Sequence, residues 1–302
     1  MQYFHEYFAD WMKVYKLGAV RPITYQKYVM TLRWLVELAP TQKICELDKR
    51  SYQNLINEYA KTHEKQTTQD FHHHLKSAIL DAFDEGLLTI DPTRKVILKG
   101  KSPAIKKPKY LSQLELQSLL KSLNLINVPN WDWFILLIAK TGLRFSEALA
   151  LTPKDFDFSG KKIKVNKTLN YKCPNGGFME TKNQSSRRTL QIDPKLNDQF
   201  FNLAGNLAED KPIFVKGRVF NSTVNDRLEK LCKIAEVPVI SIHSLRHIHA
   251  SLLIFAGVSI ASIAKRLGHS SVTTTQETYL HIIKELEDQD NDKIMRHLSS
   301  LV

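Results

Sequence analysis

The chain has 302 residues, of which 43% are hydrophobic and 25% charged, which is typical of a globular protein with room for two domains. No apolar run approaches the roughly 20 residues of a membrane span, and no basic segment followed by an apolar run begins the chain. We therefore expect a cytoplasmic protein with no membrane partner. Three widely spaced cysteines (Cys45, Cys173 and Cys232) predict reduced thiols rather than a disulfide framework or a zinc site.

Basic residues are in excess and are concentrated in two segments. Lys and Arg number 43 against 31 Asp and Glu, a formal net charge of +12. Residues 94–109 hold seven Lys or Arg and no acid, and residues 161–188 hold eight against the single Glu180. Such an excess indicates a polyanionic partner, for which nucleic acid is the usual candidate. The alternative is a merely basic surface.

Residues 1–93 are predicted to form a helical domain. Aromatic residues recur at helical spacing over 3–17, which favours a core stripe over a base-stacking platform. Further helices are expected over 22–38, 51–60 and 67–85, the last ended by Gly86. Consecutive His72, His73 and His74 point in different directions on a helix, so they are interpreted as partly exposed polar positions. In the second helix we expect Ile23, Tyr28, Leu32, Leu35 and Val36 to be buried, and Arg21, Lys27 and Arg33 to face a phosphate backbone.

The basic segment 94–109 has the composition of an exposed linker, because it combines charge with Gly100, Pro103 and Pro108. It either lies along a duplex or serves as a simple solvated tether. Its candidate phosphate contacts are Lys101, Lys106, Lys107 and Lys109.

A second domain is predicted over 110–302. Ser112 and Glu115 form a capping box at its first helix, and the apolar run 131–139 predicts a buried helix. Arg144 follows directly after a glycine turn. An arginine in such apolar surroundings needs an anion, either Glu147 three residues on or the phosphate of a ligand.

Alternating residues predict strands over 162–168, 178–180 and 187–192, with Lys182 at a hairpin tip. Helices are expected over 222–235, 244–256 and 259–267, after one opened by Pro194. A last amphipathic helix is expected over 292–301. The predicted fold class is mostly α with a small antiparallel β-sheet, a helical domain followed by an α+β domain.

Residues 242–279 carry the residue types of a phosphate-handling site. His243 and Arg246 are three apart, so on a helix they share a face and can hold one anion. His269 follows in Leu267-Gly268-His269, and Tyr279 is a potential nucleophile. A zinc site is not expected, since no Glu follows His243 as an HExxH motif requires. His247 and His249 are interpreted as packing or supporting residues.

The chain resembles the tyrosine recombinases over essentially its whole length. The resemblance rests on five features in this order: Thr141-Gly142-Leu143-Arg144 with Glu147, Lys182, His243-Ser244-Leu245-Arg246-His247, Leu267-Gly268-His269 and Tyr279. That family comprises phage and transposon integrases and the enzymes that resolve chromosome dimers. The resemblance implies a helical core-binding domain and a catalytic domain, and no metal or cofactor.

The resemblance also implies a role for each matching residue. Arg144 and Arg246 clamp the scissile phosphate, and Glu147 supports the first of them. Lys182, with Lys172 as an alternative, protonates the leaving 5′-hydroxyl. The remaining roles are proton transfer and phosphate contact for His243, a hydrogen bond to a phosphate oxygen for His269, and covalent attachment to the 3′-phosphate for Tyr279.

The implied activity is integration or excision of a mobile element through a Holliday junction. A homotetramer would act on two double-stranded DNA sites, and the protein would be a monomer in the absence of DNA. It would be associated with the nucleoid when bound to DNA, and accessory DNA-bending or excision factors would assist it. The alternatives are a chromosome-dimer resolvase, a nicking-and-closing topoisomerase and a catalytically silent DNA-binding protein. Many integrases carry an arm-binding domain before the core-binding helices, which here begin almost at the first residue. The C-terminal helix is expected to pack either on its own domain or on a neighbouring protomer.

Overall fold

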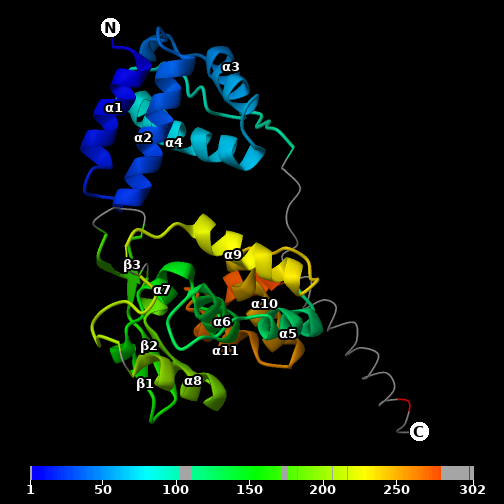
Figure 1. Ribbon diagram of the computed structural model, residues 1–302. Coiled ribbons are helices and arrows are strands. Elements are labelled where there is room, and N and C mark those ends of the chain that lie inside the picture. Colours follow the sequence, from blue (N-terminus) through cyan, green and yellow to red (C-terminus); the bar gives the residue numbers. More distant parts are fainter. Residues whose placement is uncertain are drawn as a thin grey trace. The chain divides into compact units, whose positions relative to one another are not determined.

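A computed structural model describes residues 2–102, 110–171, 176–181, 183–205, 207–215, 217–279 and 299. The chain divides between Lys106 and Lys107 into two compact units, which are described separately here (Figure 1). Within the described ranges, no helix is long and apolar enough to cross a membrane.

The first unit is built from four α-helices around an aromatic core. They are α1 (Phe4–Tyr15), α2 (Pro22–Leu38), α3 (Lys49–Ala60) and α4 (Lys65–Asp84), with a short 3-10 turn at Ile44–Glu46. The predicted aromatic stripe is confirmed as core at Phe4, Tyr7, Phe8 and Trp11, which are buried, whereas Tyr3 and Tyr15 at its two ends are exposed. Helix α4 is followed by Gly86 in the left-handed conformation, at φ +76°, as its sequence predicts.

Helix α2 begins at the predicted Pro22 but buries fewer residues than expected. Leu35 is fully buried, whereas Ile23 is 49% and Val36 is 44% exposed, so the burial prediction for these two was wrong. Val36 follows Leu35 by one residue and is therefore turned about 100° away from the contact face. Thr31 is buried instead, and its hydroxyl lies 2.9 Å from Nδ1 of His74.

His72 also corrects the sequence interpretation. It is buried rather than partly exposed, and its Nδ1 lies 3.0 Å from the hydroxyl of the fully buried Tyr52. Burial lowers the pKa of His72 to about 4. His72 is therefore a neutral core residue, whereas His73 next to it is exposed.

The first part of the predicted linker lies along the helical unit. The side chain of Gln53 bonds both the N–H and the carbonyl of Ile97 at 2.9 Å, and Lys101 N donates to the carbonyl of His63 at 2.8 Å. Val96 and Leu98 pack against the core. Residues 96–101 are therefore part of this unit rather than a free tether.

The candidate phosphate contacts of the first unit are exposed where they can be located. Arg21, Lys27, Arg33 and Lys101 are all exposed. Lys106, Lys107 and Lys109 lie outside the described residues.

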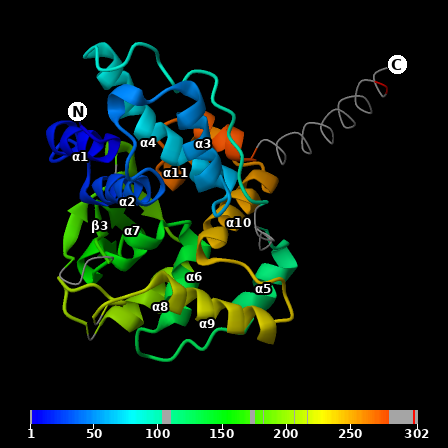
Figure 2. The same cartoon turned by 90° about the horizontal axis from the view of Figure 1, so that it is seen from above.

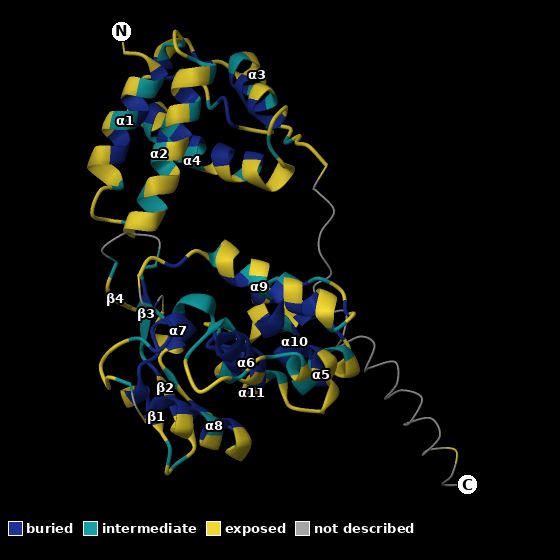
Figure 3. Ribbon diagram, in the orientation of Figure 1, coloured by how far each residue is buried: buried dark blue, intermediate teal, exposed yellow. Residues whose placement is uncertain are grey.

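The second unit is organised around α6 (Trp131–Thr141), which packs against α10 (Ile242–Phe255). Helix α6 is buried along nearly its whole length, as its apolar sequence predicts (Figure 3). Figure 2 shows α6 and α10 from above. The other helices described in this unit are α5 (Gln113–Lys121), α7 (Phe145–Leu149), α8 (Pro194–Ala204), α9 (Asn221–Ile234) and α11 (Ile260–Leu267). The predicted capping box at Ser112 is confirmed at the start of α5.

The strands form two small antiparallel sheets rather than one. Strands β1 (Phe156–Asp157), β2 (Lys162–Val165) and β5 (Arg188–Gln191) pair in the order β1-β2-β5, and β3 (Lys167–Leu169) pairs with β4 (Phe178–Glu180). The chain thus runs out along β2 and β3 and returns along β4 and β5. Lys182, predicted at a hairpin tip, follows β4 in the sequence and lies outside the described residues. The short β1 was not predicted.

Candidate active site

The C-terminal end of α11 receives three arginines from three different elements. The carbonyls of residues 266, 267 and 268 accept hydrogen bonds from Arg188 Nε at 2.6 Å, Arg246 Nη2 at 2.7 Å and Arg144 Nη2 at 2.8 Å. The last carbonyls of a helix have no partner within the helix, and they form the negative end of its dipole. The end of α11 therefore fixes the positions of all three guanidinium groups.

Gly268 permits this arrangement in two ways. It ends α11 in the left-handed conformation at φ +68°, which favours glycine. A Cβ atom at this position would lie 2.8 Å from Arg188 Nη1 and 3.2 Å from Cα of Ser186. The Leu267-Gly268-His269 motif therefore needs its glycine for both backbone conformation and space.

Arg144 is the residue that precedes α7, and Glu147 in the first turn holds it from two sides. Its Nη1 donates to Glu147 Oε1 at 2.7 Å, and its backbone N–H donates to Oε2 at 3.1 Å. The ion pair expected from the sequence is thus present. The Arg144 side chain is 34% exposed and that of Glu147 only 1%, so the guanidinium is the part that an incoming anion can reach.

Arg188 is a site residue that the sequence analysis missed. Its side chain is 5% exposed, and Nη2 donates to Glu147 Oε2 at 2.9 Å while Nη1 donates to the carbonyl of Ser186 at 3.0 Å. Strand alternation offered a signal, because Arg188 lies on the same strand face as the buried Leu190. An arginine on the buried face of a strand requires an anion inside the protein.

Glu147 is shared between Arg144 and Arg188. Burial raises the pKa of this carboxyl, but the charges and hydrogen bonds of Arg188 and Arg144 outweigh burial and hold the pKa below its usual value. Glu147 is therefore an anion at neutral pH, and each of its two oxygens accepts a hydrogen bond from one of the two guanidiniums.

Arg246 projects from α10 into the same region and is 4% exposed. Its Nη1 donates to the carbonyl of Gly142 at 2.6 Å. Burial, followed by the charge of Arg144, lowers the pKa of Arg246 to about 9, so it remains charged at neutral pH. The end of α11 thus holds three guanidiniums with one carboxylate, that of Glu147, and the excess positive charge suits a bound anion.

His269 lies next to these arginines as a neutral imidazole. Burial, together with the charges of Arg246, Arg144 and Arg188, lowers its pKa to about 4. Its Nδ1 lies 2.7 Å from the hydroxyl of the buried Thr275, which fixes the ring orientation.

Tyr279 ends the described helical residues 272–279 and is 1% exposed. Its ring packs in a cluster with Ala250, Ile254, Ile263 and Leu267. Burial raises the pKa of the phenol to about 12, although the charge of Arg246 opposes this rise. The hydroxyl lies 3.1 Å from Nδ1 of His247.

The three histidines of α10 have different surroundings. His243 is exposed, and its ring stands edge-on to that of His247 with 4.9 Å between the ring centres. His249 packs behind the site, with Nδ1 3.0 Å from the carbonyl of Ala139 and Nε2 accepting from Arg266 Nε at 2.9 Å. His249 is therefore a packing residue, as expected, whereas His247 directly contacts the phenol.

The structure thus brings together Arg144, Glu147, Arg246 and His269, with Arg188 added to them. Lys182 and its alternative Lys172 lie outside the described residues. In the sequence, Lys172 falls between β3 and β4, and Lys182 falls between β4 and β5. In the part of the chain that the structure describes, no group of three or more His, Cys, Asp or Glu side chains is placed to hold a metal ion.

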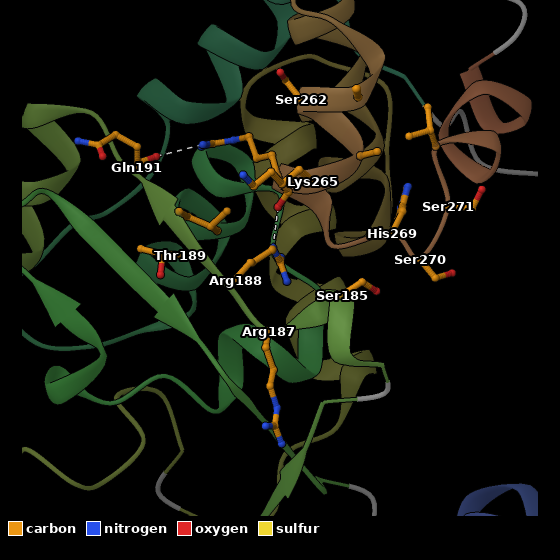
Figure 4. A pocket seen from close by; sticks show the side chains of 15 residues that line it. Ser185, Arg187, Arg188, Thr189, Gln191, Ser262, Lys265, His269, Ser270 and Ser271 are labelled. Carbon is orange, nitrogen blue, oxygen red and sulfur yellow. Dashed lines mark hydrogen bonds between the residues drawn. The ribbon is translucent and has the colours of Figure 1, made fainter.

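A cavity of about 600 Å³ adjoins the site between β5 and α11. Figure 4 shows Arg188 pointing from β5 toward α11, and Arg187 pointing away from it. The lining of the cavity includes no carboxylate. It combines His269 with cationic and hydroxyl-bearing side chains, among them Arg187, Arg188, Lys265, Arg266, Ser262, Ser270 and Ser271.

Comparison with known proteins agrees with this arrangement. The family model described as "Phage integrase family" matches residues 109–285. The chain therefore belongs to the phage integrase family, the tyrosine-type site-specific DNA recombinases.

Several individual relatives are integrases, and others are tyrosine recombinases of the XerC and XerA types. The chain is 26% identical over 287 residues to the integrase of Staphylococcus phage L54a, covering 82% of this chain and 79% of that protein. Its fold is similar to that of the Tn1549 transposon integrase in complex with a circular intermediate DNA (TM-score 0.74, 20% identity, 92% of this chain and 94% of that one). It is also similar in fold to a lambda integrase in a tetramer bound to a Holliday junction (TM-score 0.67, 16% identity, 90% and 79%).

Proposed function

We propose that this recombinase is the integrase of a mobile element and that Tyr279 is its nucleophile. Tyr279 attacks a phosphodiester of one DNA strand and forms a 3′-phosphotyrosyl bond, which releases a 5′-hydroxyl. The 5′-hydroxyl of a partner duplex then attacks this bond, so that strands are exchanged through a Holliday junction. The observation that carries the proposal is the group of three guanidiniums held at the end of α11, one of which, Arg246, acts by its charge on the buried phenol.

The arginines and His269 have the properties that phosphoryl transfer requires. Negative charge grows on the non-bridging phosphate oxygens in the transition state, and guanidiniums fixed in advance stabilise it there. We assign this role to Arg144 and Arg246, with Glu147 holding Arg144. His269, a neutral imidazole, hydrogen-bonds a phosphate oxygen.

The leaving 5′-oxygen needs a proton, which a lysine can supply. We assign this role to Lys182, which lies between β4 and β5 in the sequence, and a phosphate-contacting role to His243. Because the phosphotyrosine conserves the energy of the broken phosphodiester, strand exchange needs no nucleotide.

Double-stranded DNA is the proposed partner. Support comes from the net charge of +12, from the cavity beside the site with its basic lining, and from the exposed Arg21, Lys27, Arg33 and Lys101. Lys106, Lys107 and Lys109 add to the same basic segment. By analogy with the lambda integrase tetramer on its junction, we propose that four copies act on two DNA sites and that the protein is associated with the nucleoid.

Replacement of Tyr279 by phenylalanine should abolish covalent attachment to DNA while leaving the fold intact. The phenyl ring still fills the apolar cluster, and only the contact with His247 is lost, which is about 1 kcal/mol for one hydrogen bond. The target duplex is first identified by denaturing the wild-type protein on DNA and sequencing the strands that stay attached.

That duplex, nicked just beyond the scissile phosphate so that the cleaved fragment diffuses away, then serves as a suicide substrate. Wild-type protein should accumulate as a denaturation-resistant complex, and Tyr279→Phe should form none. A Tyr279→Phe protein that behaves like the wild type would rule out the proposed nucleophile.

A further inference from the structure

The contact between His247 and Tyr279 indicates a catalytic residue beyond those matched above. We propose that His247 is the general base that takes the phenolic proton of Tyr279 during strand cleavage. This inference rests on the proposed function, and it assigns to His247 a step for which the sequence analysis considered only His243.

The geometry favours His247 over the other candidate bases. Its Nδ1 lies 3.1 Å from the phenolic oxygen, within the reach of direct proton transfer. In the described ranges, His247 is the one residue with a hydrogen bond to this hydroxyl. His243 lies one helical turn earlier, with its ring edge-on to that of His247. The ring of His247 in turn contacts the ring of Tyr279.

The other basic groups are committed elsewhere. His269 is held by Thr275 and has its pKa lowered to about 4 by burial and three arginines, which makes it a weak base. Both oxygens of Glu147 accept hydrogen bonds from Arg144 and Arg188. Neither group is bonded to the phenolic oxygen in the described structure.

The surroundings of Tyr279 make a contacting base necessary. The phenol is 1% exposed in an apolar cluster, where a free phenolate would be poorly solvated. Its pKa near 12 means that almost none of it is ionised at neutral pH. A base in contact removes the proton as the new bond forms, so that no isolated phenolate has to exist.

The proton and the bonds balance as follows. The O–H bond of Tyr279 breaks and its proton moves to Nδ1 of His247, giving an imidazolium. The phenolic oxygen bonds to phosphorus while the P–O5′ bond breaks, and the 5′-oxygen takes a proton from Lys182. In the second step a 5′-hydroxyl gives its proton to the now neutral Lys182 as its oxygen attacks phosphorus. The bond between phosphorus and the Tyr279 oxygen breaks, and the imidazolium returns its proton to that oxygen.

The test compares His247→Gln with the wild type in single-turnover cleavage of the nicked duplex. Glutamine can hydrogen-bond the phenol but cannot take its proton. We expect covalent-complex formation to slow by about 10²- to 10³-fold, the usual contribution of a general base. If His247→Gln cleaved DNA at the wild-type rate or faster, the proposal would be overturned. The role of His247 would then be only to hold Tyr279 in place.

A second substrate separates the base from the acid. Sulfur in place of the bridging 5′-oxygen leaves as a thiolate, whose conjugate thiol has a pKa of about 8.5, so it needs no proton. His247→Gln should stay slow on this substrate, whereas Lys182→Ala should recover. Recovery of His247→Gln would instead make His247 an acid and contradict the assignment.

A small base added in solution controls for misfolding. His247→Ala leaves a space of imidazole shape beside Tyr279, and added imidazole should restore cleavage in proportion to its concentration. Failure of imidazole to restore cleavage in a variant that melts like the wild type would count against the proposal. If the wild type itself formed no covalent complex with DNA, the proposed function rather than the role of His247 would be wrong.

Discussion

Arg246→Lys is expected to slow covalent-complex formation by about 10²- to 10³-fold, the effect of losing one fixed donor to a transition-state oxygen. The lysine keeps the positive charge, so affinity for DNA should change little. Its three N–H donors share one nitrogen and rotate freely. They therefore cannot reproduce the planar fork that bonds the Gly142 and Leu267 carbonyls and present further donors in a fixed direction. Single-turnover cleavage and a separate binding titration measure the two effects.

Arg227→Lys is the matched control. Arg227 bonds Asp132 through Nε and Nη2, both at 2.7 Å, and joins α9 to α6. It makes no contact with the described site residues. This variant should cleave DNA at close to the wild-type rate. If Arg246→Lys cleaved as fast as Arg227→Lys, the fixed guanidinium fork would not be needed for the reaction.

Arg188→Met should reduce both stability and cleavage, although Arg188 is not proposed to touch DNA. Its removal leaves the carboxylate of Glu147, which is 1% exposed, with only Arg144 as an ionic partner. Breaking a buried ion pair in this way costs about 3–5 kcal/mol. It also removes the bond to the carbonyl of residue 266 that helps to fix the end of α11. Cleavage should therefore fall even when each variant is assayed at the same interval below its own melting temperature.

The pH dependence distinguishes this positioning role from a loss of stability alone. Glu147 faces Arg144, Arg188 and Arg246, and its pKa in the folded protein is depressed. A depressed carboxyl pKa adds stability that is present above the unfolded pKa and is lost as the pH falls through the folded pKa. Without Arg188 the folded pKa rises, so Arg188→Met should lose cleavage at a higher pH than the wild type during acidification.

Arg227→Met provides the comparison, because it also strips a partner from a buried carboxylate, that of Asp132 at 2% exposure. It should destabilise the unit without moving the acidic limb of the cleavage profile. Superimposable pH profiles for Arg188→Met and Arg227→Met would show that Arg188 acts on stability only.

Local sequence rules predicted those parts of the fold that depend on neighbours in the chain. The start of α2 at Pro22, the capping box at Ser112 and the end of α6 before Gly142 all follow from residues within one helical turn. The Arg144–Glu147 pair was predictable for the same reason, since three residues separate its members.

Contacts between distant elements were not predictable in this way. Arg188 meets Glu147 across 41 residues, and His247 meets Tyr279 across 32. Strand alternation separates Arg188 from Arg187, which is exposed and pairs with Glu180, but it does not tell which distant carboxylate Arg188 meets. The division of the strands into two sheets depends on pairing register between strands, which residues within one helical turn do not determine.

The most direct test of the central claim is to find the atom that holds the DNA. The wild-type complex, trapped on the nicked duplex, is digested with nuclease and trypsin, and its peptides are identified by mass spectrometry. Cleavage after Arg266 and Lys284 gives the peptide of residues 267–284, whose one tyrosine is Tyr279. The account predicts a nucleotide joined through its 3′-phosphate to Tyr279 of this peptide. A nucleotide on any other residue, or no adduct from protein that has bound and cut its target, would contradict it.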